Sequence, residues 1–131
     1  MQLTTPMTDA LERYLDLSTL ELKLTAQNMA NVDTPGYRTV GFDFSEEMRR
    51  SLEALGGQAG GASDAGDTGE SLPAPRVGPV GGLLEQPDGN DVSMDREGMK
   101  MAEAQLQFRA GEALLKNQFT QVMDAIHEDE K

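Results

Sequence analysis

The sequence contains no cysteine and no tryptophan, and only 5% of its 131 residues are aromatic. The absence of cysteine excludes disulfide bonds and thiol chemistry; it is compatible with an oxidising compartment without requiring one. Hydrophobic residues make up 37% of the chain, so a large self-contained core is not expected. A chain of this length is expected to form one modest domain.

Long apolar runs are also missing. No stretch approaches the roughly 20 apolar residues that a membrane-spanning helix needs, so no direct membrane insertion is expected. The N-terminus has no basic segment followed by an apolar one, so we expect no cleaved signal peptide. The chain is therefore expected to be soluble or to assemble into something soluble.

Basic residues are few: 11 Lys and Arg stand against 23 Asp and Glu, which gives a net charge of −12. Most of this negative charge lies in the middle of the chain, because residues 43–97 hold twelve acidic and four basic residues. The segments on either side each have a net charge of −2. No basic patch is available to neutralise phosphates, so a nucleic acid partner is not expected. The nearly neutral ends can pack against copies of themselves without strong repulsion.

The residue types of catalytic and metal sites are scarce or badly spaced. His127 is the only histidine and lies in the acidic sequence HEDEK, which argues against a histidine-based triad or metal site. The sequence GGQAGG lacks the lysine and hydroxyl residue of a phosphate-binding loop. Asp64, Asp67 and Glu70 do not have the spacing of an EF-hand calcium loop. We expect no enzyme, no cofactor and no metal.

Glycine and proline divide the chain. Neither occurs between Thr8 and Asn31, and helix formers dominate there; helix-forming sequence returns at Ser93, a suitable N-cap. In this second helix, Gly98 and Gly111 are expected to be weak points. The predicted parts are an N-terminal helix (1–33), a turn with a short extended or helical segment (34–55), a Gly/Pro-rich acidic variable linker (56–90) and a C-terminal helix (91–131).

Both predicted helices repeat apolar residues every seven positions, in two series each. The series include Leu17 and Leu24, then Leu15, Leu22 and Met29, in the first helix, and Met101, Phe108, Leu115 and Val122, then Met99 and Leu106, in the second. Within each helix the two stripes lie about 140° apart. One stripe can close a hairpin between the helices, which leaves the other uncovered.

The predicted fold is therefore mainly α. Long N- and C-terminal helices pair as a coiled-coil hairpin, joined by a turn, a short extended segment and a Gly/Pro-rich variable loop. The second stripe can belong to a broad apolar face in one ordinary bundle, or it can contact neighbouring molecules. Because the chain offers no third long helix to complete such a bundle, assembly is favoured.

The first helix is followed by a sharp turn. A residue before proline is disfavoured in helical geometry, so Thr34-Pro35 ends the helix at or before Asp33. Asn31 is suited to a left-handed position at the helix end. Pro35-Gly36 fits the centre of a type II turn, in which glycine takes a positive φ. Tyr37 then leaves the turn in a fixed direction, which indicates a structural anchor more than a ligand site.

The segment after this turn is predicted to be extended. Val40, Phe42 and Phe44 alternate with Gly41 and Asp43, which gives one apolar face.

The motif Ala30-Asn31, two residues, then Thr34-Pro35-Gly36-Tyr37 resembles the A-N-x-x-T-P-G-Y signature of bacterial flagellar axial proteins, which form the rod, the hook and the hook–filament junction. Asp43-Phe44 follows it as in the proximal rod subunits. The sequence GNDVSMDRE at residues 89–97 is similar to their G-N-x-V-x-M/L-D-x-E pattern. The short length also fits, and the likeness covers residues 10–45 and 88–125.

This resemblance implies a structural subunit of the proximal rod, which self-assembles into a helical drive shaft that transmits torque and surrounds the export channel. It implies flagellum-specific type III export without a cleaved signal and assembly in the periplasm. The implied partners are further copies of the chain, other proximal rod subunits, the rod–ring adaptor FliE, the export gate and the inner-membrane ring. The alternatives are another axial rod subunit, or a helical-hairpin adaptor or export chaperone.

Overall fold

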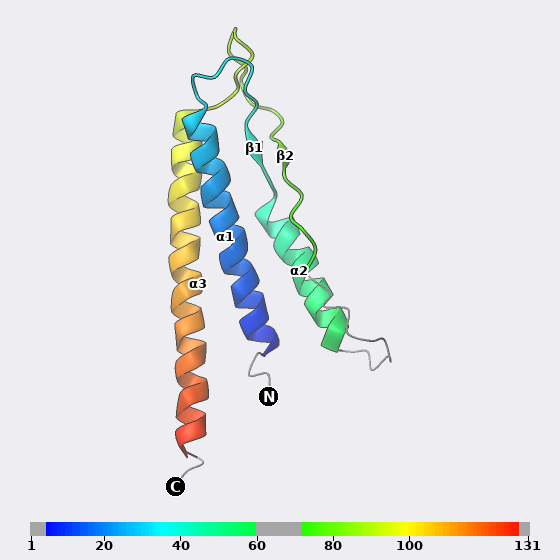
Figure 1. Ribbon diagram of the computed structural model, residues 1–131, viewed down its shortest axis with the longest axis vertical. Helices are drawn as coiled ribbons and strands as arrows, with labels where there is room; N and C mark the ends of the chain where they lie inside the picture. The colour runs from blue at the N-terminus through cyan, green and yellow to red at the C-terminus, as the bar shows by residue number, and fades with distance from the viewer. Residues whose placement is uncertain (1–4, 60–71, 129–131) are drawn as a thin grey trace.

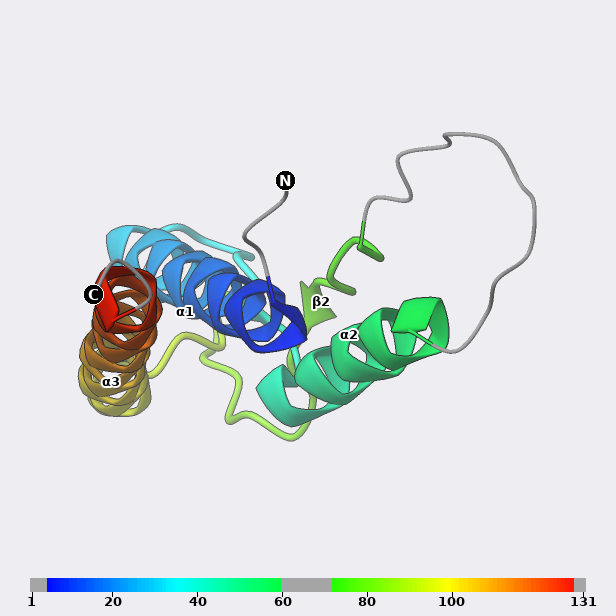
Figure 2. The same cartoon turned by 90° about the horizontal axis from the view of Figure 1, so that it is seen from below.

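The computed structural model describes residues 5–59 and 72–128, without the side chains of 58, 59 and 128. These residues form the helices α1 (Pro6–Ala30), α2 (Phe44–Ala59) and α3 (Met94–Glu128), and the short strands β1 (Val40–Gly41) and β2 (Gly78–Pro79). Helices α1 and α3 run antiparallel side by side, and α2 flanks the other side of α1 (Figures 1 and 2). The prediction of a mainly helical fold with long, paired terminal helices is confirmed.

Helix α1 begins at a complete N-terminal cap. The Thr5 hydroxyl accepts a hydrogen bond from the Thr8 N–H at 3.2 Å, and Pro6 occupies the first turn. At the other end Asn31 has φ −109° and ψ 16°, so the left-handed conformation predicted for it is wrong. Its side-chain amide instead donates to the Gln27 carbonyl at 2.8 Å, which satisfies one of the last carbonyls of the helix without positive φ.

Helix α3 begins after Ser93, whose hydroxyl accepts a long hydrogen bond of 3.4 Å from the Arg96 N–H. Asp95 and Glu97 lie in the first turn, where negative charge stabilises a helix. The helix has 35 residues against 25 in α1, and its C-terminal part extends past the start of α1 (Figure 1). Much of α3 is therefore left without cover from α1.

The contact between α1 and α3 depends on small residues of α3. Ala104 and Gly111 are both buried. A Cβ atom added at Gly111 would lie 2.9 Å from the side chains of both Leu15 and Tyr14. Gly111 thus permits the close approach of the two helices, although the sequence indicated only a helix-weakening residue. At Gly98, by contrast, an added Cβ would meet nothing within 4 Å.

Helix α2 begins earlier than the alternating pattern predicted. Only Val40 and Gly41 form a strand, and Phe44 is the first residue of the helix, so the extended assignment of Phe44 is wrong. The Asp43 carboxylate accepts a hydrogen bond from the Glu46 N–H at 3.0 Å and caps the helix. The Phe44 ring packs edge-on against Tyr14 with 5.3 Å between centroids, which attaches α2 to α1.

Part of the Gly/Pro-rich region folds back onto β1. Strand β2 pairs with β1 in antiparallel register, and the Val80 N–H donates to the Thr39 carbonyl at 2.9 Å. The Arg13 guanidinium of α1 donates to the Pro73 carbonyl at 2.6 Å and to the Ser51 hydroxyl at 2.9 Å. Asp64, Asp67 and Glu70 lie outside the described residues.

The core contains few apolar side chains. In the described part of the chain, the buried hydrophobic residues are Leu11, Leu17, Leu24, Val92 and Ala104. Buried polar and charged residues are more numerous, and they concentrate where α1, β1 and the start of α3 meet. Within the same residues, no helix has an apolar stretch long enough to cross a membrane.

Candidate functional site

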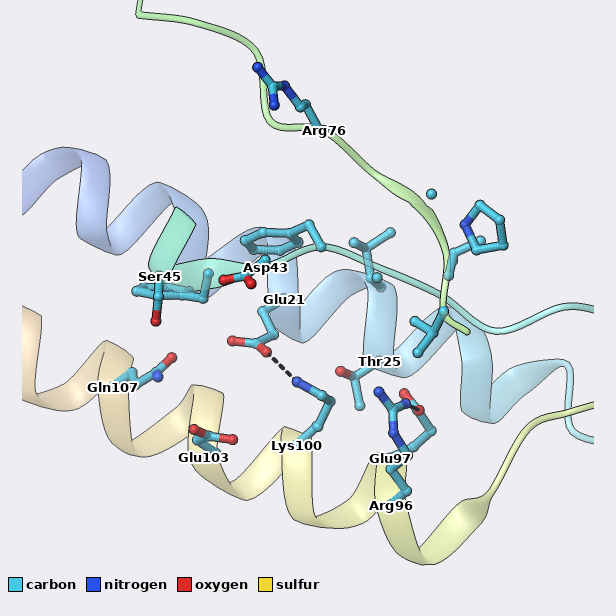
Figure 3. Close-up of a pocket in the computed structure, with 18 residues that line it drawn as sticks. Glu21, Thr25, Asp43, Ser45, Arg76, Arg96, Glu97, Lys100, Glu103 and Gln107 are labelled. Atoms are coloured by element: carbon cyan, nitrogen blue, oxygen red, sulfur yellow. Dashed lines mark hydrogen bonds and ion pairs between the residues drawn. The ribbon is translucent and has the colours of Figure 1, made fainter. Parts of the chain in front are cut away.

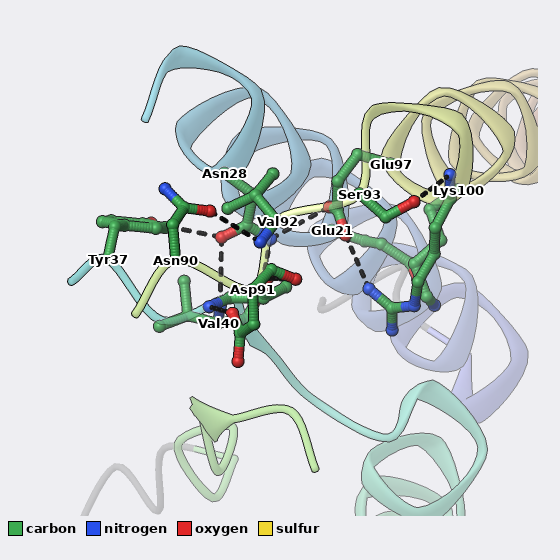
Figure 4. Close-up of polar contacts among 12 residues, drawn as sticks. Glu21, Asn28, Tyr37, Val40, Asn90, Asp91, Val92, Ser93, Glu97 and Lys100 are labelled. Atoms are coloured by element: carbon green, nitrogen blue, oxygen red, sulfur yellow. Dashed lines mark hydrogen bonds and ion pairs between the residues drawn. The ribbon is translucent and has the colours of Figure 1, made fainter. Parts of the chain in front are cut away.

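The two sequence motifs that lie some 60 residues apart meet at one place, which we call the junction: residues 31–39 after α1 and residues 88–93 before α3 (Figure 4). Asn90 is fully buried there. Its amide nitrogen donates to the carbonyls of Asn31 at 2.9 Å and Thr34 at 2.8 Å, and its oxygen accepts from the Val92 N–H at 2.8 Å. One side chain thus holds both segments of the junction.

Asp91 adds a second connection. One carboxylate oxygen accepts the Thr39 N–H at 2.6 Å, and the other lies 3.2 Å from Arg38 Nε. The Thr39 hydroxyl donates to the Asp91 carbonyl at 3.2 Å. Burial alone would raise the pKa of Asp91, but the hydrogen bonds from Thr39 and the charge of Arg38 outweigh it and hold the pKa below its ordinary value.

Asn28 is the centre of the polar contacts at the end of α1. Its amide nitrogen donates to the Val40 carbonyl at 2.8 Å and to Glu97 Oε2 at 2.9 Å. Its oxygen accepts from the Tyr37 hydroxyl at 3.1 Å and from the Val40 N–H at 3.0 Å. All four hydrogen bonds available to the side chain are made, so α1, β1, Tyr37 and α3 are linked through one buried amide.

Two glycines allow the turn and the start of α3 to come together. Gly36 has φ 73°, the positive value predicted for it, and the Tyr37 N–H closes the turn on the Thr34 carbonyl at 3.2 Å. The Gly36 N–H donates to the Asp88 carbonyl at 2.9 Å. Gly89 has φ 83°, and a Cβ there would lie 3.5 Å from the Gly36 Cα. The positive φ of both residues favours glycine.

Charged residues cross between α1 and α3 next to the junction. Glu97 is almost completely buried and accepts from Asn28 of α1 and from the Arg96 guanidinium at 2.6 Å. Lys100 pairs with Glu21 of α1 at 3.1 Å. Because both helices carry seven-residue repeats, an apolar seam alone would permit a shift by one repeat; these pairs favour a single register.

Most of the motif residues belong to the junction, but they differ in burial and role. Asn31 and Tyr37 are half-buried within it, whereas Ala30, Thr34, Pro35 and Gly36 are exposed. Asp43 and Phe44 instead cap and attach α2. Among the described residues, no group of three or more His, Cys, Asp or Glu side chains is placed to hold a metal ion.

The apolar stripes differ in exposure. Leu17 and Leu24 of α1 are buried. On α3, Met99 is 76% and Leu106 71% exposed. The remaining stripe residues are half-buried: Leu15, Leu22, Met29, Met101, Phe108, Leu115 and Val122.

Sequence reasoning missed the most connected residues of the junction, above all Asn28. A signal was present, because Tyr14, Glu21 and Asn28 are spaced by seven and form a third, partly polar series on α1. Asn90, Asp91 and Glu97 belong to the quoted motif, but its letters alone do not indicate which side chains are buried.

Comparison with known proteins gives the family. No family model matches the chain. It is 32% identical over 122 residues to the flagellar basal body rod protein FlgB of Salmonella typhimurium, an alignment that covers 88% of each chain. The FlgB proteins of Escherichia coli, at 29% over 122 residues, and Yersinia enterocolitica, at 28% over 124, are similar over 88% and 89% of this chain and over 88% and 90% of their own lengths. The chain belongs to the FlgB family of flagellar basal body rod proteins.

Proposed function

We propose that the protein is a structural subunit of the proximal rod, and that it self-assembles into the helical shaft that transmits torque and surrounds the export channel. The observation that carries this proposal is the apolar surface of α3. Its exposed large hydrophobic residues are Met94, Met99, Leu106, Leu114, Phe119, Met123 and Ile126. Such a surface along one helix is typical of a protein that buries it against partners.

These residues do not lie on one face. Leu106 and Leu114 are eight positions apart, which is about 80° around the helix, and Phe119 follows after a further 140° or so. One partner helix covers only part of this circumference. Contact with several neighbouring subunits covers it all, as in a helical tube.

The junction fits a mechanical role. Its buried hydrogen bonds fix the direction in which the chain leaves α1 and returns to α3, and a fully satisfied polar network is rigid. A shaft that transmits torque needs subunits whose elements do not slip against one another. The role therefore needs neither catalysis nor a cofactor.

Membership of the family supports a proposal for the wider setting. We propose flagellum-specific export without a cleaved signal and assembly in the periplasm. The proposed partners are other proximal rod subunits, FliE, the export gate and the inner-membrane ring. A helical-hairpin adaptor or export chaperone would also expose apolar surface, but it has no need of the junction that the two motifs build.

The test is to tag the chain in its host and purify basal bodies. We expect the tag in the rod fraction, and loss of swimming when the gene is deleted. Recovery of the tag only as a complex with exported subunits in the cytoplasm, with basal bodies intact in the deletion strain, would support the chaperone alternative.

A further inference from the structure

A cavity of about 620 Å³ lies between the α1–α3 pair and the β1–β2 strands, next to the start of α2 (Figure 3). Its volume is within the range of sites that hold a ligand or a large side chain. Charged side chains from four segments line it, among them Glu21, Asp43, Arg76, Lys100 and Glu103. Leu24, Val40, Phe42 and Phe44 add apolar walls.

Two of the residues that line this cavity each have one buried side-chain oxygen atom without a hydrogen-bond partner. These atoms are Glu21 Oε2 and Gln107 Oε1. Glu21 is only 7% exposed, and Lys100 engages its other oxygen at 3.1 Å. A buried carboxylate oxygen without a donor is unfavourable, so the cavity is suited to a group that supplies N–H donors and positive charge.

The chain's own cations near the cavity do not supply this group. Arg96 pairs with Glu97 and Lys100 with Glu21. Arg76 lines the rim, but its guanidinium points away from Glu21 (Figure 3). The Lys and Arg side chains without a hydrogen bond or ion pair in the described part of the chain are Lys23, Arg76, Arg109 and Lys116.

Arg109 is the best placed of these to serve another molecule. It is exposed and follows the exposed Leu106 by three positions, so both lie on the outer face of α3. Gln107 lines the cavity, and Arg109 follows it by two residues. Two residues correspond to a rotation of about 200° around the helix axis. Arg109 therefore points away from the cavity of its own chain.

We propose, resting on the self-assembly proposed above, that the cavity receives Arg109 of a second copy of this chain. The guanidinium lies near the Glu103 carboxylate, and small side-chain rotations at the contact bring its N–H donors to Glu21 Oε2 and Gln107 Oε1. Its planar set of five N–H donors serves two separate acceptors better than an ammonium group does. Leu106 of the same copy would pack on the apolar walls.

This contact joins two different surfaces of the same chain. Such heterologous contacts form rings when the rotation closes and open helical filaments when it does not. The proposal therefore supplies a repeating contact that builds a helical assembly from one kind of subunit.

Charge reversal in the full chain, expressed in the host, tests the contact. Glu103→Arg and Arg109→Glu each place like charges together, and we expect about a tenfold fall in assembled rods for each. The double variant restores an opposite pair between copies and should recover most of the assembly. Lys23→Glu is a matched control, since Lys23 is exposed, belongs to α1 and is outside the cavity lining, and this variant should assemble normally.

A thiol cross-link gives a second measurement, because the chain has no cysteine. Cells that carry both Glu103→Cys and Arg109→Cys chains should give covalent dimers with a short bismaleimide in isolated basal bodies. The pair Glu103→Cys and Lys23→Cys should not. If the unsubstituted chain enters the rod, but the double variant does not recover assembly and the specific cross-link does not form, this contact is overturned and the rod function is not. Failure of the unsubstituted chain to enter any rod would overturn both.

Discussion

At the scale of single residues, Tyr37 shows why an aromatic follows the sharp turn. Its hydroxyl donates to Asn28, its N–H closes the turn on Thr34, and its carbonyl accepts the Asp91 N–H at 3.3 Å. The ring is half-buried at the end of the helix pair. Tyr37 is therefore bonded to both segments of the junction and to α1.

Two substitutions of Tyr37 distinguish the stabilising contribution of its hydroxyl from that of its ring. Tyr37→Phe should lower the free energy of unfolding by about 1 kcal/mol, because one hydrogen bond to a buried amide is lost. Tyr37→Ala should lower it by about 2–4 kcal/mol, because apolar contact area is lost as well. Urea unfolding of both variants measures the difference. Equal stability of Tyr37→Phe and wild type would mean that the Asn28 contact contributes nothing.

The lowered pKa of Asp91 predicts how the stability of the protein depends on pH. Its folded-state pKa lies below the ordinary 3.8, so its stabilising contribution is fully present above about pH 3.8 and is lost as pH falls through the lower folded value. Asp91→Asn should therefore be less stable than wild type at neutral pH, and the difference should shrink below pH 3.8. Denaturant titrations at several pH values measure this. A difference that stays constant down to the acid transition would show that the carboxylate charge is unimportant.

The conformation of a single residue could be predicted from the sequence where the local backbone geometry determines it. The positive φ of Gly36 follows from Pro35-Gly36 alone, since few residues adopt that conformation. The conformation of Asn31 was predicted wrongly because its side chain caps the helix in another way. The burial of Asn28 could not be derived from local pattern, since its partners lie up to 69 positions away.

At the scale of elements, the two glycines of α3 have opposite roles. Gly98→Ala should stabilise the protein by roughly 0.5–1 kcal/mol, because the added methyl meets nothing and alanine favours a helix. Gly111→Ala should destabilise it by about 1–3 kcal/mol, because the methyl would contact Leu15 and Tyr14 at 2.9 Å.

Thermal unfolding of the two alanine variants, followed by circular dichroism, measures the opposite signs. If both variants are stabilised, α1 and α3 do not pack as closely at Gly111 as the structure has them.

The Thr5 cap that begins α1 was not predicted from the sequence. The end of α1 before Thr34-Pro35 did follow from the sequence, because helix breakers act locally. The start of α2 at Phe44 did not, since the alternation of Phe42 and Phe44 suggested a strand and the cap formed by Asp43 decided otherwise. The pairing of β2 with β1 was also absent from the prediction. It joins residues almost 40 positions apart, and the glycine- and proline-rich composition around β2 gives no strand signal.

At the scale of the whole molecule, the chain places its apolar residues unevenly. The described core has only a few buried hydrophobic side chains, while α3 leaves many large ones exposed. A protein that gained its stability within one copy would reverse this distribution. The central claim is therefore that the outer surface of α3 is an interface between subunits.

Leu106→Asp in the host tests this claim most directly. Leu106 is 71% exposed in the single chain, so the aspartate would remain solvated and the subunit should fold and be exported normally. In a packed assembly the same charge would be buried without a partner, at a cost of several kcal/mol per subunit. The measurement is swimming in soft agar, together with the amount of the chain in purified basal bodies. The account predicts normal export, no rod and no motility; cells that swim like wild type would contradict it.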